Sequence, residues 1–336
     1  FLAKLQEVFG FVPPHKHGHD AVKALQAMIE GKSKALLCLG GNFAVAMPDH
    51  ERAFPAMRGL DLSVHVGTKL NRSHLLVAKE TFILPCLGRT ELDMQETGRQ
   101  SITVEDSMSM VHASCGALKP ASRWLKSEPA IVAEMARATL PNSPVNWEDM
   151  MGDYALIRDA IADVIPAFSG YNARIAEPGG FRMDTPASRR EWKTATGKAN
   201  FVVSRERAVE RQNQPADSLV LATLRSHDQY NTTIYGMNDR YRGITGRRDV
   251  AFLSQAEADA RGLVEGDVIN IQALDDSGTP STDRVMYGLT VVIYSMAAGS
   301  IGAYLPEANV LLSLDAVDTQ SLTPAYKSVP VLIRKA

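Results

Sequence analysis

The chain has 336 residues, a length that corresponds to two domains at roughly 150 residues each. Its apolar fraction of 45% and charged fraction of 22% are ordinary for globular proteins, so disorder is excluded as the main state. Lys plus Arg number 36 and Asp plus Glu number 38, which gives a formal net charge of −2. This balance provides no overall attraction to nucleic acid or to an anionic membrane surface, and we predict neither as a partner.

The three cysteines, Cys38, Cys86 and Cys115, are far apart, and no Cys-x-x-Cys occurs. Their spacing matches no zinc or iron–sulfur binding run, and an odd, sparse count favours a reducing, cytoplasmic compartment. The chain opens at Phe1 rather than Met and shows no signal-peptide pattern, so we expect a fragment or a processed product.

Residues 1–140 alternate helix and strand. A helix is expected to begin after the N-cap Asp20 and to end at Gly31, and a second runs from Pro48-Asp49 to about Arg58. The other expected elements are a buried strand at 35–39, further strands at 62–66 and 81–84, and a helix near 71–78. This alternation predicts an α/β fold with a parallel, doubly wound (Rossmann-like) sheet. Ligands of such sheets bind at the carboxyl ends of the strands, which places 40–43, 67–71 and 85–91 on a ligand rim.

The second half has a different pattern. Residues 141–215, rich in Pro and Gly, are interpreted as a crossover and linker with a helix near 154–165. Residues 216–336 read as a small β-barrel with strands at 219–223, 268–272, 289–294 and 329–333 and a short helix at 254–261. Residues 285–306 carry no charge and are long enough to span a bilayer. Glycines and β-branched residues favour two buried strands around a Gly-rich turn instead.

Three polar segments at predicted strand ends are candidate binding loops. Gly40–Phe43 lets a backbone approach a phosphate or sugar, although the spacing alone favours an ordinary β-turn. Thr68–His74 is cationic and precedes a helix, where an anion or only solvated charges would fit. Arg225–Thr233 is dense in hydrogen-bonding side chains and suits an anionic ligand better than a plain polar loop.

Other signals are weak. Asn309 and the pair Tyr326-Lys327 stand alone near the C-terminus. His15, His17 and His19 suggest a metal site, but a solvated loop before a helix cap explains them. No spacing indicates a catalytic triad, so we assign no catalytic residue and no metal ligand.

Read as a set, these pieces resemble the C-terminal half of the molybdopterin oxidoreductases of the DMSO-reductase superfamily, in the formate-dehydrogenase-alpha-like branch. They occur in the family's order and cover nearly the whole chain. The matching segments are Gly40–Phe43 with Pro48-Asp49, Thr68–His74, Ile83–Glu91, Gln100–Ser109, Thr196–Phe201, Arg225–Thr233, Gly262–Asp267, Asn309 and Ser321–Lys327.

The resemblance implies a bis(molybdopterin guanine dinucleotide) molybdenum cofactor. Residues 1–140 would be part of the α/β domain, and 216–336 the molybdopterin-dinucleotide-binding domain, a double-psi β-barrel. Carried over by position, the residues that would contact cofactor are Gly41, Asn42, Phe43, Lys69, Asn71, Arg225, Ser226, His227, Gln229, Tyr230, Asn309, Tyr326 and Lys327.

Two departures limit what the resemblance implies. Phe43 stands where the family commonly has Pro, so this loop is expected to differ. The family's N-terminal part, which carries the molybdenum ligand, the proton-handling residues and any iron–sulfur cysteines, has no counterpart here. The sequence therefore predicts the cofactor-binding portion of a molybdenum-dependent oxidoreductase, inactive by itself, whose partner is the missing N-terminal part. A stand-alone nucleotide- or anion-binding module without redox activity is the alternative, and a structural or partner-binding remnant is a third.

Overall fold

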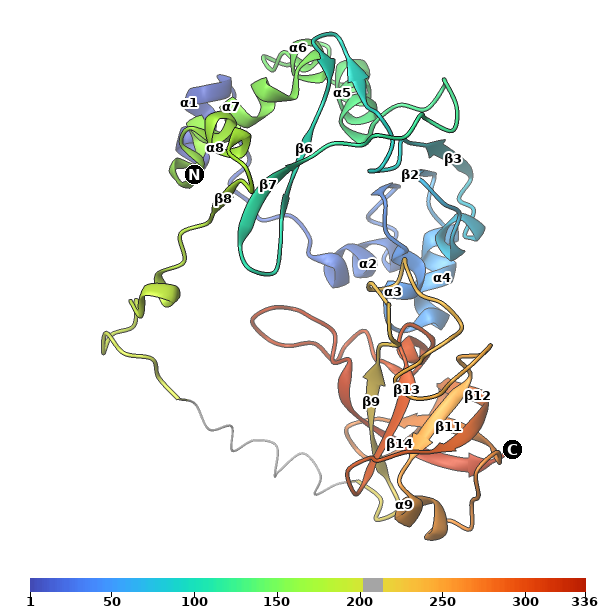
Figure 1. Ribbon diagram of the computed structural model, residues 1–336. Coiled ribbons are helices and arrows are strands. Elements are labelled where there is room, and N and C mark those ends of the chain that lie inside the picture. The colour runs from blue at the N-terminus through green and yellow to red at the C-terminus, as the bar shows by residue number, and fades with distance from the viewer. Residues whose placement is uncertain (202–213) are drawn as a thin grey trace. The chain divides into compact units, whose positions relative to one another are not determined.

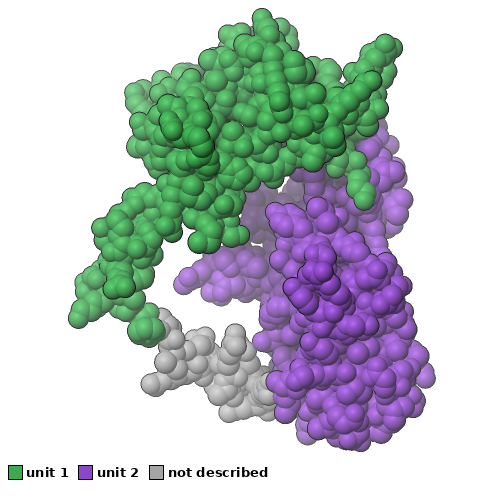
Figure 2. All heavy atoms as spheres, in the orientation of Figure 1, with its two compact units in different colours: residues 1–18, 66–69, 84–203 green, residues 19–65, 70–83, 204–336 purple. Residues whose placement is uncertain are grey.

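The structure is a computed structural model that describes residues 1–201 and 214–336. It is a mixed α/β protein with two compact units, coloured separately in Figure 2. One unit comprises residues 1–18, 66–69 and 84–203, and the other comprises 19–65, 70–83 and 204–336. We call them unit 1 and unit 2.

A three-stranded sheet contains β1 (Ala35–Leu39), β2 (Leu62–Gly67) and β3 (Glu80–Pro85) in sequence order. The connecting elements are α3 (Phe43–Ala46), α4 (His50–Arg58) and the 3₁₀ turn η1 (Arg72–Leu75). Before β1, helix α2 (Ala21–Ile29) starts as predicted, because the Asp20 side chain accepts a hydrogen bond from the Lys23 N–H at 3.0 Å. Leu25, Met57 and Leu60 form a buried cluster that packs α2 against α4.

Two expectations for this region are wrong. The strand at 35–39 is not buried, because Leu37 and Leu39 are 58% and 55% exposed. A short apolar run predicts a strand but does not show that both faces are covered. The expected helix at 71–78 is only the four-residue turn η1, because the Asn71 side chain bonds the Ser73 N–H and closes a tight local turn.

Unit 1 shows where the expected alternation of helix and strand stops. After β3 the strands form antiparallel hairpins instead: β4 (Met94–Gln95) pairs with β5 (Gly98–Arg99), and β6 (Ile102–Glu105) pairs with β7 (Met110–Ser114), which also pairs with β8 (Phe181–Arg182). The expected helix near 154–165 is confirmed as α7 (Tyr154–Val164). The other helices of unit 1 are α1 (Leu2–Phe9), α5 (Glu128–Thr139), α6 (Trp147–Gly152), α8 (Tyr171–Ala176) and the short 3₁₀ turns at 166–168 and 186–189. Residues 202–213 of the predicted linker lie outside the described residues.

The C-terminal half of unit 2 is a closed barrel, as the sequence predicted. Its strands follow the order β10-β12-β11-β14-β9-β13 (Figure 1). They are β9 (Leu219–Leu224), β10 (Val250–Leu253), β11 (Val268–Leu274), β12 (Pro280–Ile293), β13 (Ser300–Tyr304) and β14 (Lys327–Lys335). β9 pairs in parallel with β13, and β10 in parallel with β12, while the other described pairs are antiparallel. The helix α9 (Gln255–Asp259) and the 3₁₀ turn η5 (Glu307–Leu311) complete this half.

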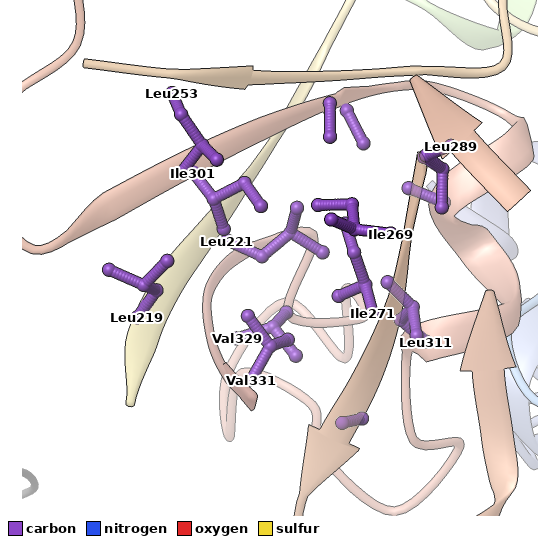
Figure 3. Packing of buried hydrophobic residues seen from close by; sticks show 14 of the residues in the cluster. Leu219, Leu221, Leu253, Ile269, Ile271, Leu289, Ile301, Leu311, Val329 and Val331 are labelled. Atoms are coloured by element: carbon purple, nitrogen blue, oxygen red, sulfur yellow. The ribbon is translucent and has the colours of Figure 1, made fainter. Parts of the chain in front are cut away.

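The barrel interior is filled by aliphatic side chains. Leu221, Ile269, Ile271 and Ile301 have no exposed surface, and Figure 3 shows them gathered in the interior from β9, β11 and β13. Strand β9 alternates buried and half-buried residues, as expected when one face meets a core. The uncharged stretch at 285–306 is confirmed as two strands, the end of β12 and β13. In the described residues, no helix combines the length and hydropathy needed to cross a membrane.

Truncating a large aliphatic side chain in this interior tests how much the barrel core contributes to stability. We expect Leu221→Ala to lower the free energy of unfolding by about 2–5 kcal/mol, because it leaves a cavity among packed side chains. Urea denaturation followed by circular dichroism measures the change. Val220→Ala, at the neighbouring half-buried position of the same strand, should cost clearly less, and equal costs would contradict this account of the core.

Candidate functional site

An open groove of about 2780 Å³ lies within unit 2. Its walls are β1 with the following loop, the Arg225–Thr233 loop, and the C-terminal segment that leads into β14. Eight of the residues predicted to contact cofactor line it: Gly41, Asn42, Phe43, Arg225, Tyr230, Asn309, Tyr326 and Lys327. Residues almost 300 positions apart in the sequence therefore share one groove.

The loop after β1 is shaped by two glycines. Gly40 and Gly41 have φ values of 64° and 74°, a region that side-chain-bearing residues rarely adopt. Asn42, which follows, is buried. Its Nδ2 donates to the Thr232 carbonyl oxygen at 3.2 Å, so this loop is bonded directly to the loop after β9.

The turn η1 and its cap Asn71 are hydrogen-bonded to the loop after β1. Asn71 Nδ2 donates to the Gly41 carbonyl oxygen at 2.7 Å. The buried Ser73 hydroxyl donates to Asn42 Oδ1 at 3.1 Å and accepts from the Ala44 N–H at 3.1 Å. Asn71 does not line the groove, and Ser73 was not among the predicted site residues. The polar run 68–74 was the only sequence signal for it.

The loop after β9 is held by a buried arginine. Arg248 donates to Ser226 Oγ at 2.8 Å, to the Leu305 carbonyl oxygen at 2.7 Å and to Glu307 at 2.7 Å. Gln229 accepts from the Ser226 N–H at 2.9 Å and donates to the Leu305 carbonyl oxygen at 2.7 Å. Neither Ser226 nor Gln229 lines the groove, so in this structure they stabilise the loop.

His227 is also turned to the interior of this loop. Its Nδ1 lies 2.7 Å from an Asp228 carboxylate oxygen, and Arg240 Nε lies 3.1 Å from its Nε2. The imidazole packs edge-on against Tyr241, with the ring centroids 4.1 Å apart. His227 is absent from the groove lining.

A buried carboxylate anchors the far end of the loop. Asp239 accepts from the Tyr304 hydroxyl at 2.8 Å and from Arg242 Nη1 at 2.6 Å. Burial raises the pKa of Asp239, but the hydrogen bonds from Tyr304 and Arg242 outweigh it, so the pKa lies below its usual value. Burial and Asp239 together raise the pKa of the Tyr304 hydroxyl, which stays protonated as the donor.

Two cations line the groove near each other. Arg225 donates to Asn231 Oδ1 at 2.7 Å, and the Lys327 ammonium donates to the Thr223 carbonyl oxygen. Burial lowers the pKa of Lys327, and the nearby Arg225 charge lowers it further. An anion at this place would relieve the repulsion and favour the charged lysine. Tyr230, 67% exposed, presents an aromatic ring to the same groove.

Asn309 and Tyr326 attach the barrel to α3. Asn309 is fully buried, and its Nδ2 donates to the Val45 carbonyl oxygen at 2.7 Å. The half-buried Tyr326 hydroxyl donates to the Ala46 carbonyl oxygen at 3.1 Å. Asn309 lines the groove. Among the described residues, its Oδ1 is a buried acceptor without a protein partner.

Lys69 is separate from this set, because it belongs to unit 1 and does not line the groove. Within residues 1–201 and 214–336, no three His, Cys, Asp or Glu side chains are arranged to hold a metal ion.

Comparison with known proteins shows what this chain is similar to. Residues 219–330 match the family described as "Molydopterin dinucleotide binding domain". The chain is 53% identical over 331 residues to "Protein YdeP" of Escherichia coli (strain K12), covering 98% of this chain and 44% of that protein. It is 24% identical over 364 residues to "Nitrate reductase" of Shewanella frigidimarina, covering 94% of this chain and 37% of that protein.

A protein named "Uncharacterized oxidoreductase" from Mycobacterium tuberculosis (strain H37Rv) is 45% identical over 334 residues, which are 98% of this chain and 42% of that protein. The solved structure of acetylene hydratase from Pelobacter acetylenicus shares the fold, with a TM-score of 0.61 at 16% identity, over 100% of this chain and 50% of that one. The chain thus spans less than half the length of the curated relatives.

Residues 219–330 are thus a molydopterin dinucleotide-binding domain, and the relatives that the chain resembles along almost its whole length include proteins named as oxidoreductases.

The arginine inside the loop after β9 gives a stability test. Arg248→Lys should lower the free energy of unfolding by about 1–3 kcal/mol, because one ammonium cannot satisfy the acceptors that the guanidinium serves. Thermal unfolding measures it. Arg247→Lys, at the adjacent exposed residue paired with Asp249, should change stability by less than about 1 kcal/mol. A comparable loss for both variants would contradict the assigned role.

The Asp239 carboxylate gives a pH test. Because its pKa is lowered in the folded state, it stabilises the fold above the unfolded pKa, near the ordinary value of 3.8, and this contribution disappears as pH falls through the folded pKa. Asp239→Asn should be less stable than wild type at pH 7, and the difference in unfolding free energy should shrink below about pH 4. A difference that is constant between pH 7 and pH 3 would exclude this linkage.

Proposed function

We propose that the chain is the cofactor-binding portion of a molybdenum-dependent oxidoreductase that resembles formate dehydrogenases. The observation that carries the proposal is the shared groove, in which the loop after β1 faces residues from the loop after β9 and from the C-terminal segment. Such a groove combines cations, an aromatic ring and backbone turns, which suits a molecule with a pyrophosphate and flat heterocycles. The proposed ligand is molybdopterin guanine dinucleotide, one half of a bis(molybdopterin guanine dinucleotide) cofactor.

The residues present fit such a ligand. Arg225 and Lys327 supply donors for a pyrophosphate. Asn309 Oδ1, the buried acceptor that lacks a protein partner, matches an N–H edge of a guanine or pterin ring. Tyr230 offers a stacking surface, and Gly41 lets the backbone of the loop after β1 approach the ligand without a side chain in the way.

The residues divide into two groups by their contacts. Gly41, Phe43, Arg225, Tyr230 and Lys327 would contact the ligand from the groove walls. The remaining predicted contacts, Asn42, Lys69, Asn71, Ser226, His227, Gln229, Asn309 and Tyr326, are proposed as cofactor residues that act directly or through the loops they hold. When bound, the cofactor's molybdenum exchanges two electrons with a small substrate, while the protein orients and tunes it.

The finer organisation is part of the same proposal. Residues 1–140 would be the α/β portion, with the parallel, doubly wound arrangement limited to the sheet of β1, β2 and β3. Residues 141–215 would be the crossover and linker, and 216–336 a double-psi barrel. No catalytic residue is assigned in this chain, so turnover, any iron–sulfur cluster and the molybdenum ligand would come from the remaining part of the enzyme. We place the enzyme in the cytoplasm.

Nucleotide binding tests the groove. By isothermal titration with GDP, Arg225→Ala should weaken binding about 10- to 100-fold, because a charge-assisted contact worth about 1.5–3 kcal/mol is lost. Arg247→Ala is the matched control, since it removes the same charge from the segment between β9 and β10 at a residue that pairs with Asp249 and does not line the groove. Equal effects of the two variants would contradict the assigned site.

Cofactor analysis separates the alternatives. Purified from a host that makes the molybdenum cofactor, the intact enzyme should contain molybdenum and release GMP on acid hydrolysis. Tight binding of free GDP by the chain, with no pterin in the intact enzyme, would favour a nucleotide-binding module instead. Formate oxidation with a dye acceptor by residues 1–336 alone would overturn the expectation that this portion is inactive.

A further inference from the structure

We infer that Ser73 is a positioning residue that couples the two walls of the groove through Asn42. Its hydroxyl is buried at the centre of the support for the loop after β1, donating to Asn42 Oδ1 and accepting from the Ala44 N–H, both at 3.1 Å. The role assigned to the ligand in this inference rests on the proposed function.

The coupling follows from how the Asn42 amide is used. An unconstrained Asn side chain can rotate and exchange its oxygen and nitrogen positions. Here Ser73 fixes the oxygen side by donating to it, because the same hydroxyl also accepts from the Ala44 N–H. The Nδ2 is then directed to the Thr232 carbonyl oxygen at 3.2 Å. A serine in η1 thereby sets a contact with a loop about 160 positions away in the sequence.

The turn η1 and its cap Asn71 also hold Gly41, the residue before Asn42. Asn71 Nδ2 bonds the Gly41 carbonyl oxygen at 2.7 Å, while Asn71 Oδ1 accepts from the Ser73 N–H at 2.9 Å. His74 Nδ1 accepts from the Asn71 N–H at 2.9 Å and closes the capping box. Residues 71–74 therefore fix both Gly41 and Asn42, and through Asn42 they fix the loop that carries Arg225.

Loss of the Ser73 hydroxyl should affect both walls of the groove. Without the Ser73 hydroxyl, Asn42 Oδ1 and the Ala44 N–H lose their shared partner, and the Asn42 amide loses its fixed orientation. The Thr232 contact then weakens, so both walls loosen although Ser73 itself does not line the groove. Ligand affinity falls because the two walls no longer hold their bound arrangement in advance.

Amide hydrogen exchange of the chain without ligand tests the coupling directly. Ser73→Ala should speed exchange in residues 225–233 by about 5- to 10-fold, in addition to residues 40–46, as expected when one buried hydrogen bond is lost. Ser63→Ala is the matched control, because Ser63 is equally buried and its hydroxyl bonds Thr81 Oγ1 at 2.8 Å away from the groove loops. It should leave exchange in 225–233 unchanged.

The second measurement is GDP affinity in a double-mutant cycle. Ser73→Ala and Asn42→Ala should each weaken binding about 10-fold, and the double variant should be no weaker than Asn42→Ala, because the two residues act through one contact. If Ser73→Ala does not fold, as judged by circular dichroism, Asn42→Ala should still raise exchange in 225–233.

The outcomes separate this inference from the proposed function. Faster exchange confined to 40–46 and 70–76, an equal effect of Ser63→Ala in 225–233, or additive losses in the cycle would overturn the coupling. Wild-type protein that fails to bind GDP, with exchange in 225–233 raised as expected, would support the coupling and count against the nucleotide site.

Discussion

The groove depends on a few buried hydrogen bonds between the barrel and the segment after β1. Asn309 and Tyr326 donate to the carbonyl oxygens that end α3, and Asn42 donates in the opposite direction to Thr232. Each such bond contributes only about 0.5–1.5 kcal/mol net. Their importance is geometric, because amide and hydroxyl donors at fixed places hold two differently folded regions at one separation and one orientation.

This arrangement explains why many polar residues near the groove do not face it. The loop after β9 forms isolated β-bridges rather than a continuous strand or helix, so many of its buried polar groups need partners from side chains. Arg248 and Gln229 meet that need by binding carbonyl and hydroxyl oxygens of the loop and of the segment after β13. A loop stabilised in this way keeps Arg225 and Tyr230 at the groove at little entropic cost on binding.

The groove combines apolar and positively charged surfaces, which suit different parts of one ligand. The exposed leucines of β1 and the ring of Tyr230 provide apolar surface, whereas Arg225 and Lys327 concentrate positive charge at one place. A ligand with flat rings joined by phosphates meets both requirements at once. The match of residues 219–330 to the molydopterin dinucleotide-binding domain agrees with this division.

The sequence by itself determined the local elements that depend on neighbouring residues. The Asp20 cap of α2, helix α7, the strand β9 and the barrel class follow from caps and periodicity, which act over a few positions. It also pointed to the polar loops, because their composition is unusual. Predictions from periodicity were wrong or missing where a feature depends on packing with distant residues. The exposed face of β1, the hairpins after β3 and the shortness of η1 are such features.

Only the tertiary structure decided which polar residues face the groove and which support it. Asn42 and Ser226 are equally polar in the sequence, yet one lines the groove while the other is covered by Arg248. Ser73 carries no motif of its own, and its role comes from the Asn42 amide that the fold brings next to it. Hydrogen-bond partners separated by tens to hundreds of positions are chosen by packing in three dimensions, and a one-dimensional pattern does not contain that choice.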